Sequence, residues 1–267
     1  MNIFKSYVSA DGIIMDYFRF GQGSNTLVIL PGLSIQSLMP LAETVAESYK
    51  MFENDYTVYL FDRRRNLPDQ YSVYDIAEDT YKVMKSLDLC DISLFGASQG
   101  GMAAMVLLSR YPALFRKAVI ASSSPIINGE NDNVLRRWID LAVKKDREAL
   151  ALDFAKSIYP ENVFTQYRDY FLGESASYTD EDLERFVILS AGTLGFDITG
   201  ELPSVSCPVF AIGACDDGVL GRGKTEMIAD LTGETDGSCM FLYSGFGHAC
   251  FDTAPDFKQN IFDFFAE

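Results

Sequence analysis

The segment DISLFGASQGGMAAMVLLSRY, residues 91–111, contains the pentapeptide Gly96-Ala97-Ser98-Gln99-Gly100. The apolar run before it predicts a strand at 91–95, and the residues after it predict a helix that ends before a proline. In this setting G-x-S-x-G is typical of a sharp strand-to-helix turn that exposes the serine hydroxyl. A Cβ at either glycine would collide with the neighbouring strand or helix. Ser98 is therefore predicted to be a nucleophile, with the positive end of a helix aimed at it.

On both sides of this segment, short β-rich stretches alternate with helical patterns. Such alternation predicts an α/β fold with a mostly parallel sheet of eight strands covered by helices. The other strands are expected at 4–8, 13–20, 25–30, 57–61, 117–121, 208–212 and 239–243, and the first two of these form a hairpin. Helices are expected at 37–52, 72–87, 223–231 and 255–265, and residues 62–69 are expected to form a polar loop.

This alternation breaks between residues 126 and 202, where no strand is evident. Helical patterns appear there at 130–144, 147–158, 161–172 and 180–191, and the segment is rich in aromatic residues such as Trp138 and Tyr170. We therefore expect two parts, a core of residues 1–125 and 203–267 and a helical cap of residues 126–202.

A serine hydroxyl needs a base to take its proton. His248 is the only histidine of the chain, and it follows the last predicted strand, where a parallel sheet would bring it to the same edge as Ser98. The third residue should be a carboxylate that fixes the histidine tautomer. Two aspartates follow the strand at 208–212, in the chain order Ser, Asp, His that suits this arrangement. We assign the role to Asp216, with Asp217 as the alternative.

An oxyanion hole requires two backbone N–H groups. One is expected from Gln99, which follows the nucleophile, and the other from Leu33 in the loop Pro31-Gly32-Leu33-Ser34. The assignment of Leu33 rests on topology alone, because any residue except proline has a backbone N–H and the residue type therefore does not identify the donor.

The composition is that of a globular protein, with 48% hydrophobic and 22% charged residues in 267. The net charge of −16 argues against nucleic acid and anionic membranes as partners. No apolar run is long enough for a transmembrane helix, and the N-terminus has no secretory signal, so a cytoplasmic location is expected. Five cysteines without a C-x-x-C pair, beside a single histidine, suggest buried thiols rather than a zinc site.

In these features the chain resembles the α/β-hydrolase superfamily, in particular its small capped serine hydrolases such as esterases and lactonases. The motifs that carry the resemblance are, in order, the loop at Pro31-Gly32, GASQGG at 96–101, GACDD at 213–217 and GFGHAC at 245–250. The resemblance implies the α/β-hydrolase fold with a helical cap inserted after the sixth strand. Two departures are noted: many relatives have His-Gly where Pro31-Gly32 stands here, and Arg64 in DRRRN matches a family arginine that we interpret as structural.

These observations predict a serine hydrolase that cleaves a small or medium apolar ester, thioester or lactone through an acyl-enzyme. Two alternatives stay open: a C–C hydrolase or lyase with the same three residues, or a ligand-sensing protein of this fold with little turnover. No metal or organic cofactor is required. The expected partner is a small-molecule substrate, and the protein is expected to be a monomer or homodimer.

Overall fold

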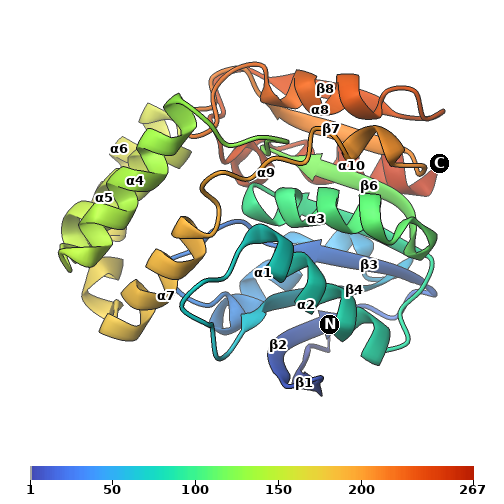
Figure 1. Cartoon of the computed structure of the whole chain (residues 1–267), viewed down its shortest axis with the longest axis horizontal. Helices are drawn as coiled ribbons and strands as arrows, with labels where there is room; N and C mark the ends of the chain where they lie inside the picture. Colours follow the sequence, from blue (N-terminus) through green and yellow to red (C-terminus); the bar gives the residue numbers. More distant parts are fainter. Residues whose placement is uncertain (1) are drawn as a thin grey trace.

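The computed structural model describes residues 2–267, apart from the side chains of Glu130 and Asn131. The strands of this part of the chain form one eight-stranded sheet (Figure 1). The order across the sheet is β1-β2-β4-β3-β5-β6-β7-β8. β2 pairs antiparallel with β1 and β4, and every other pairing is parallel. The predicted α/β-hydrolase sheet is confirmed. The strands are β1 (Phe4–Ala10), β2 (Ile13–Phe20), β3 (Asn25–Leu30), β4 (Tyr56–Arg64), β5 (Ile92–Ala97), β6 (Phe115–Ala121), β7 (Val209–Ala214) and β8 (Cys239–Tyr243).

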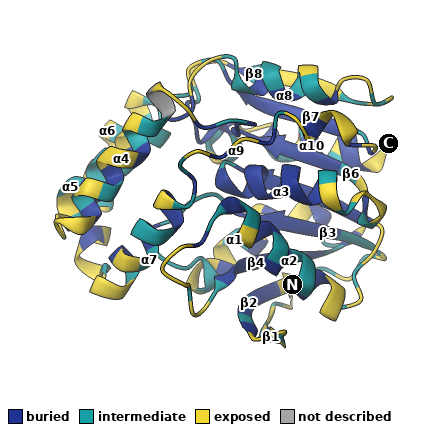
Figure 2. Ribbon diagram, viewed as in Figure 1, coloured by how far each residue is buried: buried dark blue, intermediate teal, exposed yellow. Residues whose placement is uncertain are grey.

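Helices cover both faces of the sheet. Buried residues of α2, α3 and α8 belong to one hydrophobic cluster, whereas those of α1, α9 and α10 belong to a second cluster on the opposite face. The central elements β5, β7 and most of α3 are buried. Figure 2 shows α3 mostly in dark blue. Burial on both faces explains why these strands have continuous apolar sequences. These helices are α1 (Ala42–Ser48), α2 (Val73–Ser86), α3 (Gln99–Arg110), α8 (Lys224–Thr232), α9 (Cys250–Thr253) and α10 (Phe257–Ala266).

The chain between β6 and β7 is mainly helical, and its residues 126–202 are here called the insertion. Its helices lie together on the left of Figure 1. Ile127 N–H donates to Phe196 O at 2.8 Å and Ile198 N–H donates to Pro125 O at 2.9 Å, so the two ends of the insertion lie side by side. The helices are α4 (Glu130–Val143), α5 (Arg147–Ile158), α6 (Glu161–Glu174) and α7 (Asp180–Ala191).

The chain departs from the sequence-based expectation after β4. Residues 62–69 were expected to form a polar loop, but β4 continues through Arg64, and both Asp62 and Arg63 are buried. The prediction failed because these charged side chains have partners elsewhere in the chain, which sequence periodicity does not reveal. Similarly, the helix expected at 37–52 is broken into α1 and two flanking 3-10 turns, Met39–Leu41 and Lys50–Phe52. Among residues 2–267, no helix combines the length and apolar character needed to cross a membrane.

Candidate active site

The turn between β5 and α3 carries Ser98 in a strained backbone conformation, with φ +52° and ψ −121°. Such a conformation costs about 1–3 kcal/mol and is typical of functional sites. The predicted role of the two glycines is borne out by the spacing. A Cβ on Gly96 would lie 2.6 Å from the carbonyl oxygen of Gly100, and a Cβ on Gly100 would lie 2.1 Å from that of Leu30. The close packing of α3 against β3 and β5 thus requires glycine and holds Ser98 at the end of the sheet.

His248 lies between Ser98 and an aspartate. Its Nε2 is 3.0 Å from Ser98 Oγ, and its Nδ1 is 2.8 Å from Asp217 Oδ2. The side chains of His248 and Asp217 are only 4% and 6% exposed, so little water competes for these hydrogen bonds. The loops after β5, β7 and β8 therefore bring together a hydroxyl, an imidazole and a carboxylate.

The environment of Asp217 favours its charged form. Burial by itself raises the pKa of this carboxyl group, but attraction to His248 and hydrogen bonds from His248, Leu220 and Val219 hold the pKa below its ordinary value of 3.8. Asp217 Oδ1 accepts the backbone N–H groups of Val219 at 2.8 Å and Leu220 at 2.9 Å, which leaves Oδ2 for the histidine. The two bonds fix the carboxylate in one orientation.

The assignment of Asp216 as the partner of His248 is wrong in this structure, because the neighbouring aspartate occupies that place. Asp216 instead accepts the backbone N–H of Gly245 at 3.0 Å and that of Gly247 at 3.2 Å. It is exposed, and it holds the loop that leads to His248. Two adjacent residues at the end of a strand point in different directions, and here only the second reaches the imidazole.

The two expected oxyanion-hole residues, Leu33 and Gln99, line the same cavity as Ser98 and His248. The loop that carries Leu33 passes close to Ser98, since a Cβ on Gly32 would lie 3.2 Å from Ser98 Cβ. Gln99 begins α3, so its N–H is one of the free donors of a helix N-terminus. The structure thus places both candidate donor segments beside Ser98.

The cavity beside Ser98 has a volume of about 60 Å³ and is lined mainly by apolar side chains. Trp138 and Phe154 of the insertion and Met102 of α3 form part of its wall. A wider groove of about 490 Å³, here called the outer groove, lies between residues 34–41 and helices α5 and α6. Phe154 lines both spaces, so the two adjoin. Within residues 2–267 no group of three or more His, Cys, Asp or Glu residues is arranged to hold a metal ion.

The sequence did not predict a network of buried polar side chains at the cavity, two of which, Gln99 and Thr193, line it. Arg63 of β4 is buried and donates from Nη2 to Gln99 Oε1 at 3.0 Å. Gln99 Nε2 in turn donates to Leu189 O at 2.9 Å and to Thr193 Oγ1 at 2.7 Å in the insertion. The only signal in the sequence was the run of charges directly after an apolar strand, which also fits a solvent-exposed loop.

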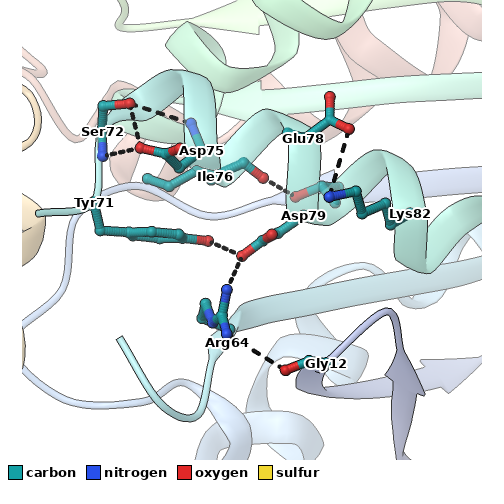
Figure 3. A network of polar contacts seen from close by, with 10 residues as sticks. Gly12, Arg64, Tyr71, Ser72, Asp75, Ile76, Glu78, Asp79 and Lys82 are labelled. Carbon is teal, nitrogen blue, oxygen red and sulfur yellow. Dashed lines mark hydrogen bonds and ion pairs between the residues drawn. The ribbon is translucent and has the colours of Figure 1, made fainter. Parts of the chain in front are cut away.

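Arg64, by contrast, has the structural role that the sequence suggested. Its guanidinium contacts Asp79 of α2 at 3.5 Å and the carbonyl oxygen of Gly12 at 3.4 Å, as Figure 3 shows. Asp79 also accepts the hydroxyl of Tyr71 at 2.8 Å. Arg64 thus ties the β1–β2 turn to helix α2.

Comparison with known proteins agrees with the fold described above. Residues 25–255 match the family model described as alpha/beta hydrolase fold. The chain is 24% identical over 236 residues to "Serine hydrolase BPHL" of Mus musculus, covering 83% of this chain and 73% of that protein. It is also 24% identical over 232 residues to "Putative carbamate hydrolase RutD" of Caulobacter segnis, covering 83% of this chain and 85% of that one.

Solved structures show the same fold over nearly the whole chain. MGS-M2, an alpha/beta hydrolase enzyme from a deep-sea metagenome library, superposes with a TM-score of 0.87 at 17% identity, covering 98% of both chains. The enol-lactonase from Burkholderia xenovorans LB400 gives a TM-score of 0.80 at 15% identity, covering 98% of this chain and 100% of that one. The chain belongs to the alpha/beta hydrolase family, and the prediction that it is a hydrolase enzyme of this fold is confirmed.

Proposed function

We propose that the protein hydrolyses esters with a short apolar acyl group, and that Ser98, His248 and Asp217 form its catalytic triad. The observation that carries the proposal is the unbroken chain of contacts from Ser98 Oγ through His248 to Asp217, with distances of 3.0 and 2.8 Å. A nucleophile, a base and an orienting carboxylate within hydrogen-bond reach are the geometry that acyl transfer needs.

The reaction would proceed in two steps. Ser98 Oγ attacks the carbonyl carbon while its proton passes to His248 Nε2, and the N–H groups of Leu33 and Gln99 stabilise the oxyanion. The intermediate collapses, His248 protonates the departing alcohol, and the acyl group stays on Ser98. Water then adds to the acyl-enzyme with His248 again as base, which releases the carboxylic acid and restores Ser98.

The size of the cavity favours a short acyl group. Its 60 Å³ is well below the about 150 Å³ of an apolar protein cavity known to bind benzene. The outer groove is large enough for the alcohol part of the ester, and the aromatic side chains of Tyr159 and Phe171 are among the residues that line it. Helices of the insertion line both the cavity beside Ser98 and the outer groove, so the insertion would act as a cap that selects the substrate.

A fluorophosphonate probe and a series of nitrophenyl esters test this proposal. The probe should modify Ser98 in the native protein and should not modify the Ser98→Ala variant. Among acetyl, butyryl and octanoyl esters, kcat/KM should be highest for the shortest chains. Trp138→Ala, which enlarges the cavity, should shift the preference towards longer chains. Lactones and thioesters belong in the same panel.

The alternatives would give other results. Cleavage of a C–C bond in a diketone by the wild type, without ester turnover, would favour a C–C hydrolase with the same residues. A ligand that binds tightly, together with no turnover of any ester, lactone or thioester, would favour a sensing protein. The intact nucleophile, base and acid favour turnover over sensing.

A further inference from the structure

The guanidinium of Arg63 joins the two chain segments that carry the candidate oxyanion-hole donors. Its Nη2 donates to the carbonyl oxygen of Pro31 at 2.8 Å and to Oε1 of Gln99 at 3.0 Å. Pro31 begins the loop that contains Leu33, and Gln99 is the residue after the nucleophile. One side chain from β4 thus bridges the loop after β3 and the start of α3.

The burial of Arg63 at this position carries an unfavourable desolvation free energy. It is only 5% exposed, and among the described residues its Nε is buried without a hydrogen-bond partner. The adjacent carboxylate of Asp62 accepts from the Arg63 backbone N–H at 2.7 Å, while its ion pair is with Arg185, at 2.6 Å. Burying a cation whose side-chain acceptors are neutral oxygens is unfavourable relative to burying an apolar side chain of similar size. A cost of this kind, next to a reactive serine, indicates a role in function.

The charge of Arg63 persists at neutral pH. Burial lowers its pKa to about 10, and repulsion from Arg185 acts in the same direction, while attraction to Asp62 opposes both. Charge-assisted hydrogen bonds are about twice as strong as neutral ones. The bonds of Arg63 to Pro31 and Gln99 are therefore suited to holding two segments rigidly.

The position of the Pro31 carbonyl determines how the loop faces Ser98. A peptide group is planar, so fixing this carbonyl also fixes the N–H of Gly32, one residue before the candidate donor Leu33. There is little space for the loop to adjust, because a Cβ on Gly32 would already lie 3.2 Å from Ser98 Cβ. A rotation of this peptide would move the Leu33 N–H relative to the nucleophile.

We propose that Arg63 is a positioning residue that sets the geometry of the oxyanion hole by clamping the Pro31 carbonyl to the side chain of Gln99. The proposal rests on the function proposed above, since it assumes that Leu33 and Gln99 supply the two donors. Gln99 extends the clamp to the insertion through Leu189 and Thr193, so the hole and the cap share one polar connection.

The test compares Arg63→Met and Arg63→Lys with Arg64→Met, an arginine-to-methionine change at the next position of the same strand. The first readout is the second-order rate at which a fluorophosphonate modifies Ser98, because this reaction needs the nucleophile and the hole but not turnover. The second is kcat and KM for a nitrophenyl acetate, and the third is the affinity for a trifluoromethyl ketone, whose adduct carries an oxyanion. Circular dichroism and thermal unfolding report how much of each variant is folded.

Loss of one oxyanion-hole donor lowers kcat by about 10²–10³-fold in other serine hydrolases. We therefore expect Arg63→Met to lower the labelling rate and kcat by about 10²-fold, with KM changed less than about threefold. Affinity for the ketone should fall with kcat. Arg63→Lys keeps the charge but lacks the planar fork, so it should restore part of the rate. Arg64→Met should label at the wild-type rate.

Folded Arg63→Met with labelling and kcat within threefold of the wild type would overturn the proposal, as would losses that follow only the folded fraction. If Arg63→Met does not fold, Arg63→Lys decides by the same criteria. Wild type that is labelled at Ser98 but turns over no ester would refute the proposed function, and the labelling rates would still decide the role of Arg63. A wild type in which Ser98 is not labelled would refute both.

Discussion

Replacing each of the two adjacent aspartates by asparagine should separate their roles. Asp217 receives three hydrogen bonds: two from backbone N–H groups to Oδ1 and one from His248 to Oδ2. In Asp217→Asn, the remaining carbonyl oxygen would stay with the two backbone donors, which leaves the NH₂ group facing His248 Nδ1. Two donors cannot face each other, so the imidazole would carry its proton on Nε2, towards Ser98.

An imidazole with its proton on Nε2 cannot accept the proton of Ser98. An aspartate-to-asparagine change that traps this tautomer lowers kcat by about 10⁴-fold in serine proteases, which corresponds to about 5.4 kcal/mol of transition-state stabilisation. Asp216→Asn should lose only one of its two bonds to the loop before His248, a cost of about 1 kcal/mol. We therefore expect Asp216→Asn to lower kcat less than tenfold.

The assay is steady-state hydrolysis of a nitrophenyl acetate at pH 7 and pH 9, with thermal unfolding of both variants as the control for folding. Equal losses in the two variants would mean that the loop geometry, and not the tautomer, controls activity. A large loss in Asp216→Asn beside a nearly active Asp217→Asn would refute the assignment and restore Asp216 as the acid.

Three further outcomes are expected from charged and thiol groups. Folding lowers the pKa of Asp217 from 3.8, so the contribution of this carboxylate to stability is full above that pH and is lost as the pH falls through the folded pKa. The difference in unfolding free energy between wild type and Asp217→Asn, measured by urea titration, should therefore shrink below about pH 4. Arg185→Met should lower the unfolding free energy by about 3 kcal/mol, because it leaves buried Asp62 without its ion pair. Adding Asp62→Asn should recover part of this loss of stability, and strictly additive losses in the double variant would contradict the pairing. Burial raises the pKa of Cys250 to about 11, so iodoacetamide at pH 8 should modify exposed Cys90 and leave Cys250 unmodified until the protein unfolds, as mass spectrometry would show.

Local sequence patterns predicted those parts of the fold that depend on burial. The bounds of β2, β3 and β8 match the expected strands, because each strand is a run of apolar or alternating residues ended by glycine, proline or serine. Ser98 was found in the same way, since two glycines and a helix start surround it. These signals all lie within a few residues of the feature they predict.

Contacts between distant segments could not be predicted in this manner. The choice between Asp216 and Asp217 depends on which of two adjacent side chains turns towards His248, 31 residues further along. The clamp of Arg63 joins residues 32 and 36 positions away, and its burial contradicts the usual position of arginine at the surface. Only the folded arrangement supplies the partners that make such burial possible.

The meeting of the two ends of the helical insertion has a consequence for how this enzyme could diversify. Because Ile126 and Asp197 pair in an isolated β-bridge between the end of β6 and the start of β7, the segment between them can change in length or sequence without altering strand order. In the proposed function, the helices that line the substrate cavity are then exchangeable, whereas Ser98, Asp217 and His248 stay in the loops that follow strands of the sheet. The polar connection through Gln99 sets the limit, since any replacement segment would have to offer acceptors to that amide.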